Sequence, residues 1–359
     1  MSILLNKPLE PNFKKLVKYL EKVNSSGWYT NFGPLHEELT RRLEEYLNVE
    51  NLLLVSNGTL AIQVACKVLK VNSAITTPFS FVATTSALLW QGIDTAFSDI
   101  DPDNLNLSAP SLSKTLCKDS SYDGVIATHV FGNPCDVNEL ETATKKYQKK
   151  LIYDAAHCFG VDFGEKSILK FGDASTLSFH ATKVFHTVEG GAIIFKRKSD
   201  YEKAKELINF GIQSDGSLGE PGINAKLNEY QCAVGLTLLD EIDDVIKRRA
   251  SLFEQYRDEL REYVSLPIWH TEASINGAYM PILIENKLEQ QKVIEILKAN
   301  NVQSRRYFNP SLDTAYSELA NFGSEISRHV ADCILCLPLH SYMNENEVSY
   351  VSKLVRSAL

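Results

Sequence analysis

Short apolar stretches recur along the first part of the chain, and segments with helical periodicity separate most of them. Strands buried on both faces read as such continuous apolar stretches, and parallel strands need long connections, usually helices. The pattern therefore favours a largely parallel sheet with helices wound around it, an α/β fold. The strands that it predicts cover residues 52–55, 74–77, 95–97, 124–127, 151–153, 175–178 and 192–195.

Helical periodicity is clearest in two segments. Residues 35–47 repeat leucine and tyrosine at intervals of three and four, and Pro34 suits the first turn of that helix. Residues 228–263 repeat apolar positions in the same way. They predict one long helix or a broken pair of helices.

The chain beyond this long helix predicts a second, smaller unit. A strand at 278–284, a helix at 288–299 and a strand at 332–337 would build a small α/β domain. No Gly/Ser-rich linker marks the boundary, so we expect the long helix to make it. The prediction is a large domain over residues 1–240 and a small C-terminal domain over residues 241–359.

Composition narrows the class of protein. The 359 residues are 44% hydrophobic and 23% charged, which is enough to bury a large core. The formal net charge of −8, without a Lys/Arg-rich block, argues against a nucleic-acid partner. No apolar stretch approaches the ~18 residues of a membrane span, and residues 1–10 lack the apolar core of a signal peptide.

The cysteines and histidines complete this picture. Seven cysteines, an odd number scattered along the chain, indicate free thiols in a reducing compartment. We therefore expect a cytoplasmic protein. The eight histidines show no zinc-ligand spacing, so no metal site is predicted.

One lysine and one aspartate indicate the chemistry. Asp154 ends the apolar stretch 151–153, so it would stand at the carboxyl end of a buried parallel strand, where ligands of α/β sheets bind. Lys183 follows the next predicted strand along the chain. A lysine amine used for covalent chemistry must be neutral part of the time, in a desolvated pocket or bonded to a cofactor. Pyridoxal phosphate (PLP) uses such a lysine, with an acid that keeps its ring nitrogen protonated.

Each of these features also has an ordinary structural interpretation. A lone lysine between apolar stretches is commonly a surface residue, and an aspartate at a strand end commonly caps a helix. The Ser-Asn-Gly-Thr turn at 56–59 lies between a strand and a helix, where free backbone N–H groups can bind an anion. Similar turns cap many helices that bind nothing. Taken together, the three features are harder to explain in this ordinary way, and they leave a PLP site open.

Eight short segments occur in an order shared with a known family. They are 30–34 (TNFGP), 56–59 (SNGT), 78–84 (PFSFVAT), 154–157 (DAAH), 178–183 (SFHATK), 189–191 (EGG), 224–231 (NAKLNEYQ) and 305–308 (RRYF). Over essentially its whole length the chain resembles the DegT/DnrJ/EryC1/StrS group of PLP-dependent nucleotide-sugar aminotransferases. The resemblance implies the aspartate-aminotransferase-like fold, the type I PLP fold.

The resemblance also implies catalytic and cofactor-binding roles. Lys183 would form the covalent link to PLP and move the proton between substrate carbon and cofactor. Asp154 would pair with the pyridine nitrogen. Phe81 would stack on the pyridine ring, and His157 would lie near the ring hydroxyl. A flat ring is well matched by an aromatic face.

Two further groups of residues complete the implied cofactor site. Gly58, Thr59 and Ser178 resemble the phosphate cradle, since a dianionic phosphate binds helix-end amides and hydroxyls. Asn224 and Lys226 match a segment that in the family reaches across a dimer interface to the partner's cofactor. We therefore expect a homodimer with active sites at the subunit interface.

The substrate residues are predicted from the same segments and from charge. An anionic substrate needs local basic groups, and Arg305 is one candidate, although it could also be a solvated strand end. His186 could contact the sugar or could satisfy backbone groups. The predicted substrate-binding residues are Thr30, Asn31, Gly33, His186, Lys226, Arg305 and Tyr307.

The implied activity is transfer of the amino group of L-glutamate to a nucleotide-linked 4-keto-6-deoxy sugar. The expected substrate is dTDP-4-dehydro-6-deoxy-D-glucose, giving dTDP-4-amino-4,6-dideoxy-D-glucose for surface polysaccharide such as O antigen. Three alternatives stay open: a 3-aminotransferase, another PLP-dependent nucleotide-sugar enzyme such as a dehydratase, and a noncatalytic regulator. Dehydratases of the family replace the lysine with histidine, so Lys183 favours transamination.

Overall fold

An eight-stranded sheet forms the centre of the molecule, in a computed structural model that describes residues 2–359. Strand β9 is antiparallel to both of its neighbours, and the other neighbouring strands are parallel. The order across the sheet is β1 (Leu52–Val55), β9 (Gly191–Phe195), β8 (Ala174–Ser178), β5 (Lys150–Asp154), β4 (Gly124–Thr128), β2 (Ser73–Thr76), β3 (Asp94–Phe97) and β11 (Ala320–Asn321). The predicted α/β fold is confirmed, and each of the seven predicted strands is found with its ends within one residue.

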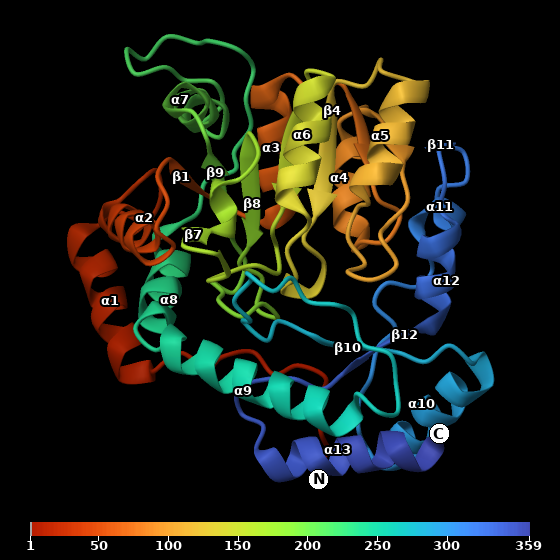
Figure 1. The fold of residues 1–359 in the computed structure, drawn as a ribbon. Helices are drawn as coiled ribbons and strands as arrows, with labels where there is room; N and C mark the ends of the chain where they lie inside the picture. Colours follow the sequence, from red (N-terminus) through yellow and green to blue (C-terminus); the bar gives the residue numbers. More distant parts are fainter. Residues whose placement is uncertain (1) are drawn as a thin grey trace.

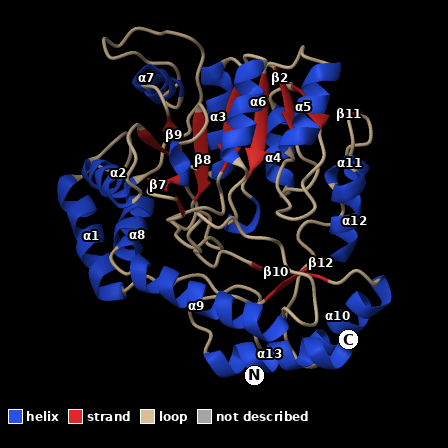
Figure 2. Cartoon of the chain, viewed as in Figure 1, coloured by secondary structure: helices blue, strands red, loops and turns tan. Residues whose placement is uncertain are grey.

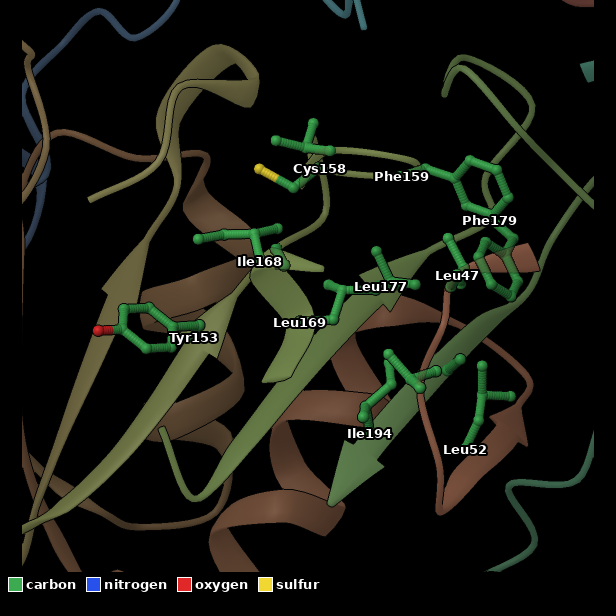
Figure 3. Packing of buried hydrophobic residues seen from close by; sticks show 14 of the residues in the cluster. Leu47, Leu52, Tyr153, Cys158, Phe159, Ile168, Leu169, Leu177, Phe179 and Ile194 are labelled. Atoms are coloured by element: carbon green, nitrogen blue, oxygen red, sulfur yellow. The ribbon is translucent and has the colours of Figure 1, made fainter. Parts of the chain in front are cut away.

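Helices cover both faces of this sheet, because its strands are apolar on both faces (Figures 1 and 2). In β1, Leu52 and Leu54 belong to one buried cluster, and Leu53 and Val55 belong to another. Figure 3 shows part of the first cluster. The helices of the sheet unit are α2 (Pro34–Tyr46), α3 (Gly58–Leu69), α4 (Val82–Trp90), α5 (Ala109–Lys118), α6 (Val137–Lys146) and α7 (Lys198–Leu207).

The predicted long helix is a broken pair. Helix α8 (Glu229–Leu239) ends before Asp240, and α9 (Ile242–Leu260) begins after Glu241. Acidic residues in the first turn of α9 favour a new helix start there, because they complement the helix dipole. In Figure 1, α9 runs along the lower edge of the sheet unit and faces the remaining C-terminal elements.

The C-terminal unit packs around a second apolar cluster, which includes Ile282, Leu297 and Leu335 and also takes in Phe131 of the sheet unit. Strands β10 and β12 pair antiparallel, and helices lie against them. The elements of this unit are β10 (Met280–Leu283), α10 (Lys287–Ala299), α11 (Leu312–Ala315), α12 (Glu325–Cys333), β12 (Ile334–Leu337) and α13 (Glu345–Ala358). The predicted strand, helix and strand of the small domain are confirmed within two residues at their ends.

Backbone pairing at two places is among the contacts that cross the predicted domain boundary. Strand β11 of the C-terminal part joins the large sheet beside β3, and Ile3 of the N-terminus forms a bridge with Val302 of the small unit. The division at residues 240 and 241 stays a prediction. The remaining elements are α1 (Phe13–Ser26), β6 (Asp162–Phe163), β7 (Lys166–Ser167) and the short helices η1 (Val130–Gly132) and η2 (Ile168–Lys170). Within residues 2–359, no helix has the length and apolar composition needed to cross a membrane.

Candidate active site

A cavity of about 370 Å³ opens at the carboxyl ends of β4, β5 and β8, between the sheet and the C-terminal unit. Ligands of open α/β sheets bind at this edge, because helix N-termini and strand-end side chains converge there. The cavity is lined by the predicted residues Gly58, Thr59, Phe81, Asp154, His157, Ser178, Lys183, Arg305 and Tyr307.

Lys183 reaches the cavity from the loop that follows β8, and its ammonium lies 6.0 Å from the centroid of the Tyr279 ring. Burial lowers the pKa of the Lys183 amine, while the nearby groups of Asp154 and Tyr307 act in the opposite direction. The net pKa shift is downward. A lysine with a lowered pKa is neutral more of the time, so more of its amine is available at neutral pH to act as a nucleophile or to accept a proton.

Asp154 is the last residue of β5, and its side chain is buried. Its Oδ1 accepts a hydrogen bond from the backbone N–H of Ala156 at 3.1 Å. Its Oδ2 accepts a hydrogen bond from the Thr84 hydroxyl at 2.7 Å. Each carboxylate oxygen thus has one hydrogen-bond donor. The site therefore holds an oriented carboxylate, of the kind that a protonated ring nitrogen needs as a partner.

The N-terminus of α3 forms a cradle for an anion. The helix starts at Gly58, and the side chain of Asn57 caps it by accepting a hydrogen bond from the N–H of Leu60 at 2.8 Å. A Cβ atom on Gly58 would lie only 2.9 Å from the Cβ of Ser178. Glycine thus lets the helix end approach the end of β8, where free N–H groups meet the hydroxyls of Ser178 and Thr59. This arrangement fits a phosphate dianion.

His157 presents a hydrogen-bond donor to the cavity. Its Nδ1 accepts a hydrogen bond from the backbone N–H of Phe131 at 3.1 Å, and burial keeps the pKa of the imidazole well below its usual range. The ring is therefore neutral, and its proton resides on Nε2. Such a donor suits an anionic oxygen, as on the hydroxyl of a PLP ring.

The C-terminal unit contributes an aromatic wall. Phe308 stacks on Phe131, with ring centroids 5.7 Å apart, and Tyr279 packs against His157 and Tyr307. Tyr279 and Phe308 line the cavity but were not among the residues predicted for the site. Tyr279 precedes β10 without a local polar motif, so only the fold brings it to the cavity. Phe308 does belong to the segment 305–308, and that segment could have identified it.

Arg305 supplies a permanent positive charge to the cavity. Its guanidinium lies 4.7 Å from the centroid of the Tyr307 ring, and its backbone pairs with Cys336 of β12. The guanidinium of the adjacent Arg306 instead donates to the carboxylate of Asp332 at 3.1 Å. The two neighbouring arginines therefore have different surroundings, and only Arg305 lines the cavity.

Several predicted residues lie outside this cavity. Thr30 and Asn31 are exposed, and Gly33 is the N-cap of α2, where the buried carboxylate of Glu229 accepts hydrogen bonds from the helix N-terminus. Asn224 is exposed, and Lys226 donates to Asn209 at 2.9 Å. Contacts of these residues with substrate, or with the cofactor of a second subunit, stay predictions.

His186 is buried, and both of its ring nitrogens have backbone partners. Nε2 contacts the carbonyl of Leu9 at 3.0 Å, and Nδ1 accepts from the N–H of Val188 at 3.1 Å. These bonds tie the loop that carries Lys183 to the N-terminal segment. They match the alternative in which His186 satisfies backbone groups, and its contact with substrate stays a prediction.

The residues of the cavity fit PLP on structural grounds. The glycine-dependent cradle matches a phosphate, the Asp154 carboxylate matches a protonated pyridine, and Lys183 lies in the same cavity with a lowered pKa. Phe81 is half exposed at the start of α4 and can offer its ring face.

Comparisons with known proteins agree with this geometry. The model of the DegT/DnrJ/EryC1/StrS aminotransferase family matches residues 12–356. A dTDP-4-amino-4,6-dideoxy-D-glucose transaminase of Shigella dysenteriae is 36% identical, covering 99% of this chain and 98% of the relative. A protein of the same name from Escherichia coli is 34% identical with the same coverage.

A solved structure shares the whole fold. The structure of DesI in the presence of its TDP-sugar product has a TM-score of 0.93 and 28% sequence identity, and it covers 99% of this chain and 92% of that chain. Fold, site and sequence agree, and the chain belongs to the DegT/DnrJ/EryC1/StrS aminotransferase family.

Proposed function

We propose that this aminotransferase uses PLP to move the amino group of L-glutamate to C4 of dTDP-4-dehydro-6-deoxy-D-glucose. The product would be dTDP-4-amino-4,6-dideoxy-D-glucose, a precursor of surface polysaccharide such as O antigen, made in the cytoplasm. The observation that carries the proposal is the cavity in which Lys183, with its lowered pKa, lies with the oriented carboxylate of Asp154. The names of the two transaminase relatives support the choice of sugar.

The cofactor would be held by residues whose chemistry matches its parts. Gly58, Thr59 and Ser178 would bind the phosphate, and Asp154 would pair with the ring nitrogen. Phe81 and His157 would contact the ring face and the ring hydroxyl. When bound, PLP supplies an electron sink that stabilises negative charge on the substrate carbon.

Lys183 would handle the proton in both halves of the reaction. Its neutral amine takes a proton from Cα of glutamate, and in the second half it delivers a proton to C4 of the sugar. Burial supports both steps, because it moves the pKa of the amine down towards neutral pH, where the amine can both accept and release a proton. Arg305, as a fixed cation of the cavity, would attract the carboxylates of glutamate and the diphosphate of the sugar.

We further infer that the active enzyme is a homodimer. Asn224 and Lys226 do not line the cavity of their own chain, and Asn224 is exposed. Exposed apolar side chains of Phe210, Leu218 and Ile223 lie in the same loop region. A second copy that covers this region would bury apolar surface and could receive the two polar side chains at its own cavity.

A substrate panel tests the proposal. The enzyme, PLP and glutamate are incubated separately with the 4-keto-6-deoxy sugars linked to dTDP, UDP and GDP, and with a dTDP-linked 3-keto-6-deoxy sugar. Mass spectrometry and NMR then identify each product. A 4-amino product that forms fastest from the dTDP sugar is expected. Exclusive amination of the 3-keto sugar would favour the 3-aminotransferase alternative.

A further inference from the structure

A buried hydroxyl on α4 contacts the carboxylate of Asp154. Thr84 lies in the first turn of that helix and is fully buried. Its Oγ1 lies 2.7 Å from Oδ2 of Asp154, and the contact joins residues far apart in the chain. A carboxylate can only accept, so the Thr84 hydroxyl is the donor.

This bond completes the orientation of the carboxylate. The backbone N–H of Ala156 holds Oδ1 from the turn after β5, and the Thr84 hydroxyl holds Oδ2 from a different element. With one donor on each oxygen, rotation of the carboxylate about its terminal bond would break both hydrogen bonds.

Helix α4 joins two parts of the candidate cofactor site. Phe81 is the N-cap of this helix and lines the cavity, and Thr84 follows one turn later. The backbone N–H of Thr84 donates to the carbonyl of Phe81 at 3.2 Å. The same helical turn therefore sets both the aromatic ring and the donor to Asp154.

The next residue shows that the bond is specific to one position. Thr85 is also fully buried on α4, but its hydroxyl has no hydrogen-bond partner within residues 2–359. A buried threonine on this helix therefore does not acquire a partner merely by being buried. The chain supplies a matched pair of buried hydroxyls, one bonded to Asp154 and one not.

We propose that Thr84 is a positioning residue that holds the carboxylate of Asp154 in the orientation needed for the ring nitrogen of PLP. This inference rests on the proposed function, since it concerns the same cofactor site. Loss of the hydroxyl would leave Oδ2 of Asp154 without its donor, and only the N–H of Ala156 would then orient the carboxylate. Its pairing with the ring nitrogen would then weaken, although no atom that touches the cofactor would have changed.

The test compares Thr84→Val with Thr85→Val. Each substitution replaces a buried hydroxyl with a methyl group of similar size. The readouts are the dissociation constant of PLP and the pH at which the absorbance of the bound cofactor changes. Thermal melting of each protein before PLP addition reports on folding.

Thr84→Val is expected to weaken PLP binding about tenfold, because a hydrogen bond to a charged group is lost. The absorbance change should move to higher pH, since a less firmly protonated ring withdraws fewer electrons from the nitrogen of Lys183. Thr85→Val should match the wild type in both readouts. Thr84→Ser, which keeps the hydroxyl, should restore most of the affinity.

Unchanged PLP affinity and an unchanged pH transition in Thr84→Val would overturn the inference. An equal loss in Thr85→Val would also overturn it, because the effect would then belong to helix packing. If Thr84→Val does not fold, Thr84→Cys and Thr84→Ser decide the matter, since only the serine keeps a strong donor. Failure of the wild type itself to bind PLP would instead count against the proposed function.

Discussion

Burial gives Lys183 the property that its proposed role needs. The desolvated amine has a lowered pKa, while the charge of Asp154 in the same cavity opposes that shift. The two residues are thus coupled: Asp154 limits how far the pKa of the lysine falls. A change at Asp154 should therefore be visible in the titration of Lys183.

This coupling predicts a pH dependence with a definite sign. The rate at which PLP bonds to the cofactor-free enzyme should rise with pH and level off below pH ~10.4, the ordinary lysine pKa, because only the neutral amine reacts. In Asp154→Asn the plateau should begin at lower pH, since the charge that raises the pKa of Lys183 is gone. Stopped-flow absorbance measures both profiles. A plateau that moves to higher pH would contradict the coupling.

The two neighbouring arginines offer a second test at this scale. Arg305→Gln should raise the KM for the nucleotide sugar or for glutamate about tenfold or more, because a charged hydrogen bond to an anion is lost. Arg306→Gln is the matched control, since Arg306 pairs with Asp332 and does not line the cavity. Steady-state kinetics of the two variants compare them directly. Equal effects of the two substitutions would remove Arg305 from the substrate site.

Short sequence segments predict a cavity residue from the local pattern alone when that residue lies at the end of a single strand or helix. Asp154 ends an apolar strand, and Gly58 starts a helix after a strand, so both could be predicted from short segments. Tyr279 could not, because its position in the cavity depends on how the C-terminal unit packs against the sheet. Thr84 lay in a matching segment, but its bond to Asp154 requires α4 and β5 to meet.

At the scale of elements, the junction of α3 with β8 is the tightest part of the site. Any side chain at position 58 would meet Ser178, and the helix end would have to move away from the strand end. The phosphate cradle depends on that close approach. Glycine is required there for space, since a bulkier residue would separate the amides from the serine hydroxyl.

Gly58→Ala should therefore weaken PLP binding more than it destabilises the fold. We expect a loss of affinity of at least about tenfold, as overpacking by one methyl group commonly costs about 1–3 kcal/mol. Fluorescence titration with PLP measures the affinity, and thermal melting of the cofactor-free protein measures the stability. Normal affinity in a variant with a lowered melting temperature would separate Gly58 from the phosphate site.

Element prediction worked best for long or strongly apolar segments. The seven strands of continuous apolar sequence were found almost at their predicted ends. Strand β11 was not predicted, because it is two exposed residues long and is defined only by its pairing with β3. The break between α8 and α9 was left open by the pattern, since apolar positions recur on both sides of Asp240.

At the scale of the whole molecule, the C-terminal unit is attached to the large sheet at several points. Strand β11 extends the sheet, and the carboxylate of Asp99 at its edge accepts hydrogen bonds from the N-terminus of α12. These contacts fix the C-terminal unit against the sheet unit, and so they fix the two walls of the cavity relative to each other. Arg305 and Tyr279 gain their places in the cavity from this attachment.

The proposed homodimer predicts that two different inactive chains can complement each other. Lys183→Ala and Asn224→Ala chains, each impaired by itself, should recover activity when they are co-expressed, because a mixed dimer contains one complete site. Lys183→Ala with Asp154→Asn is the matched control, since both residues lie in the same cavity and no mixed site is complete. Activity of purified mixed dimers is the measurement. Recovery in neither pair would place Asn224 outside the partner's site.

The most direct test of the account follows the nitrogen itself. Glutamate labelled with ¹⁵N is incubated with dTDP-4-dehydro-6-deoxy-D-glucose and PLP, and NMR locates the label in the sugar product. The wild type should place the label on C4, and Lys183→Ala should lose at least about a hundredfold in rate while keeping its fold. A label on another carbon, an unlabelled sugar, or full transfer by Lys183→Ala would contradict the account.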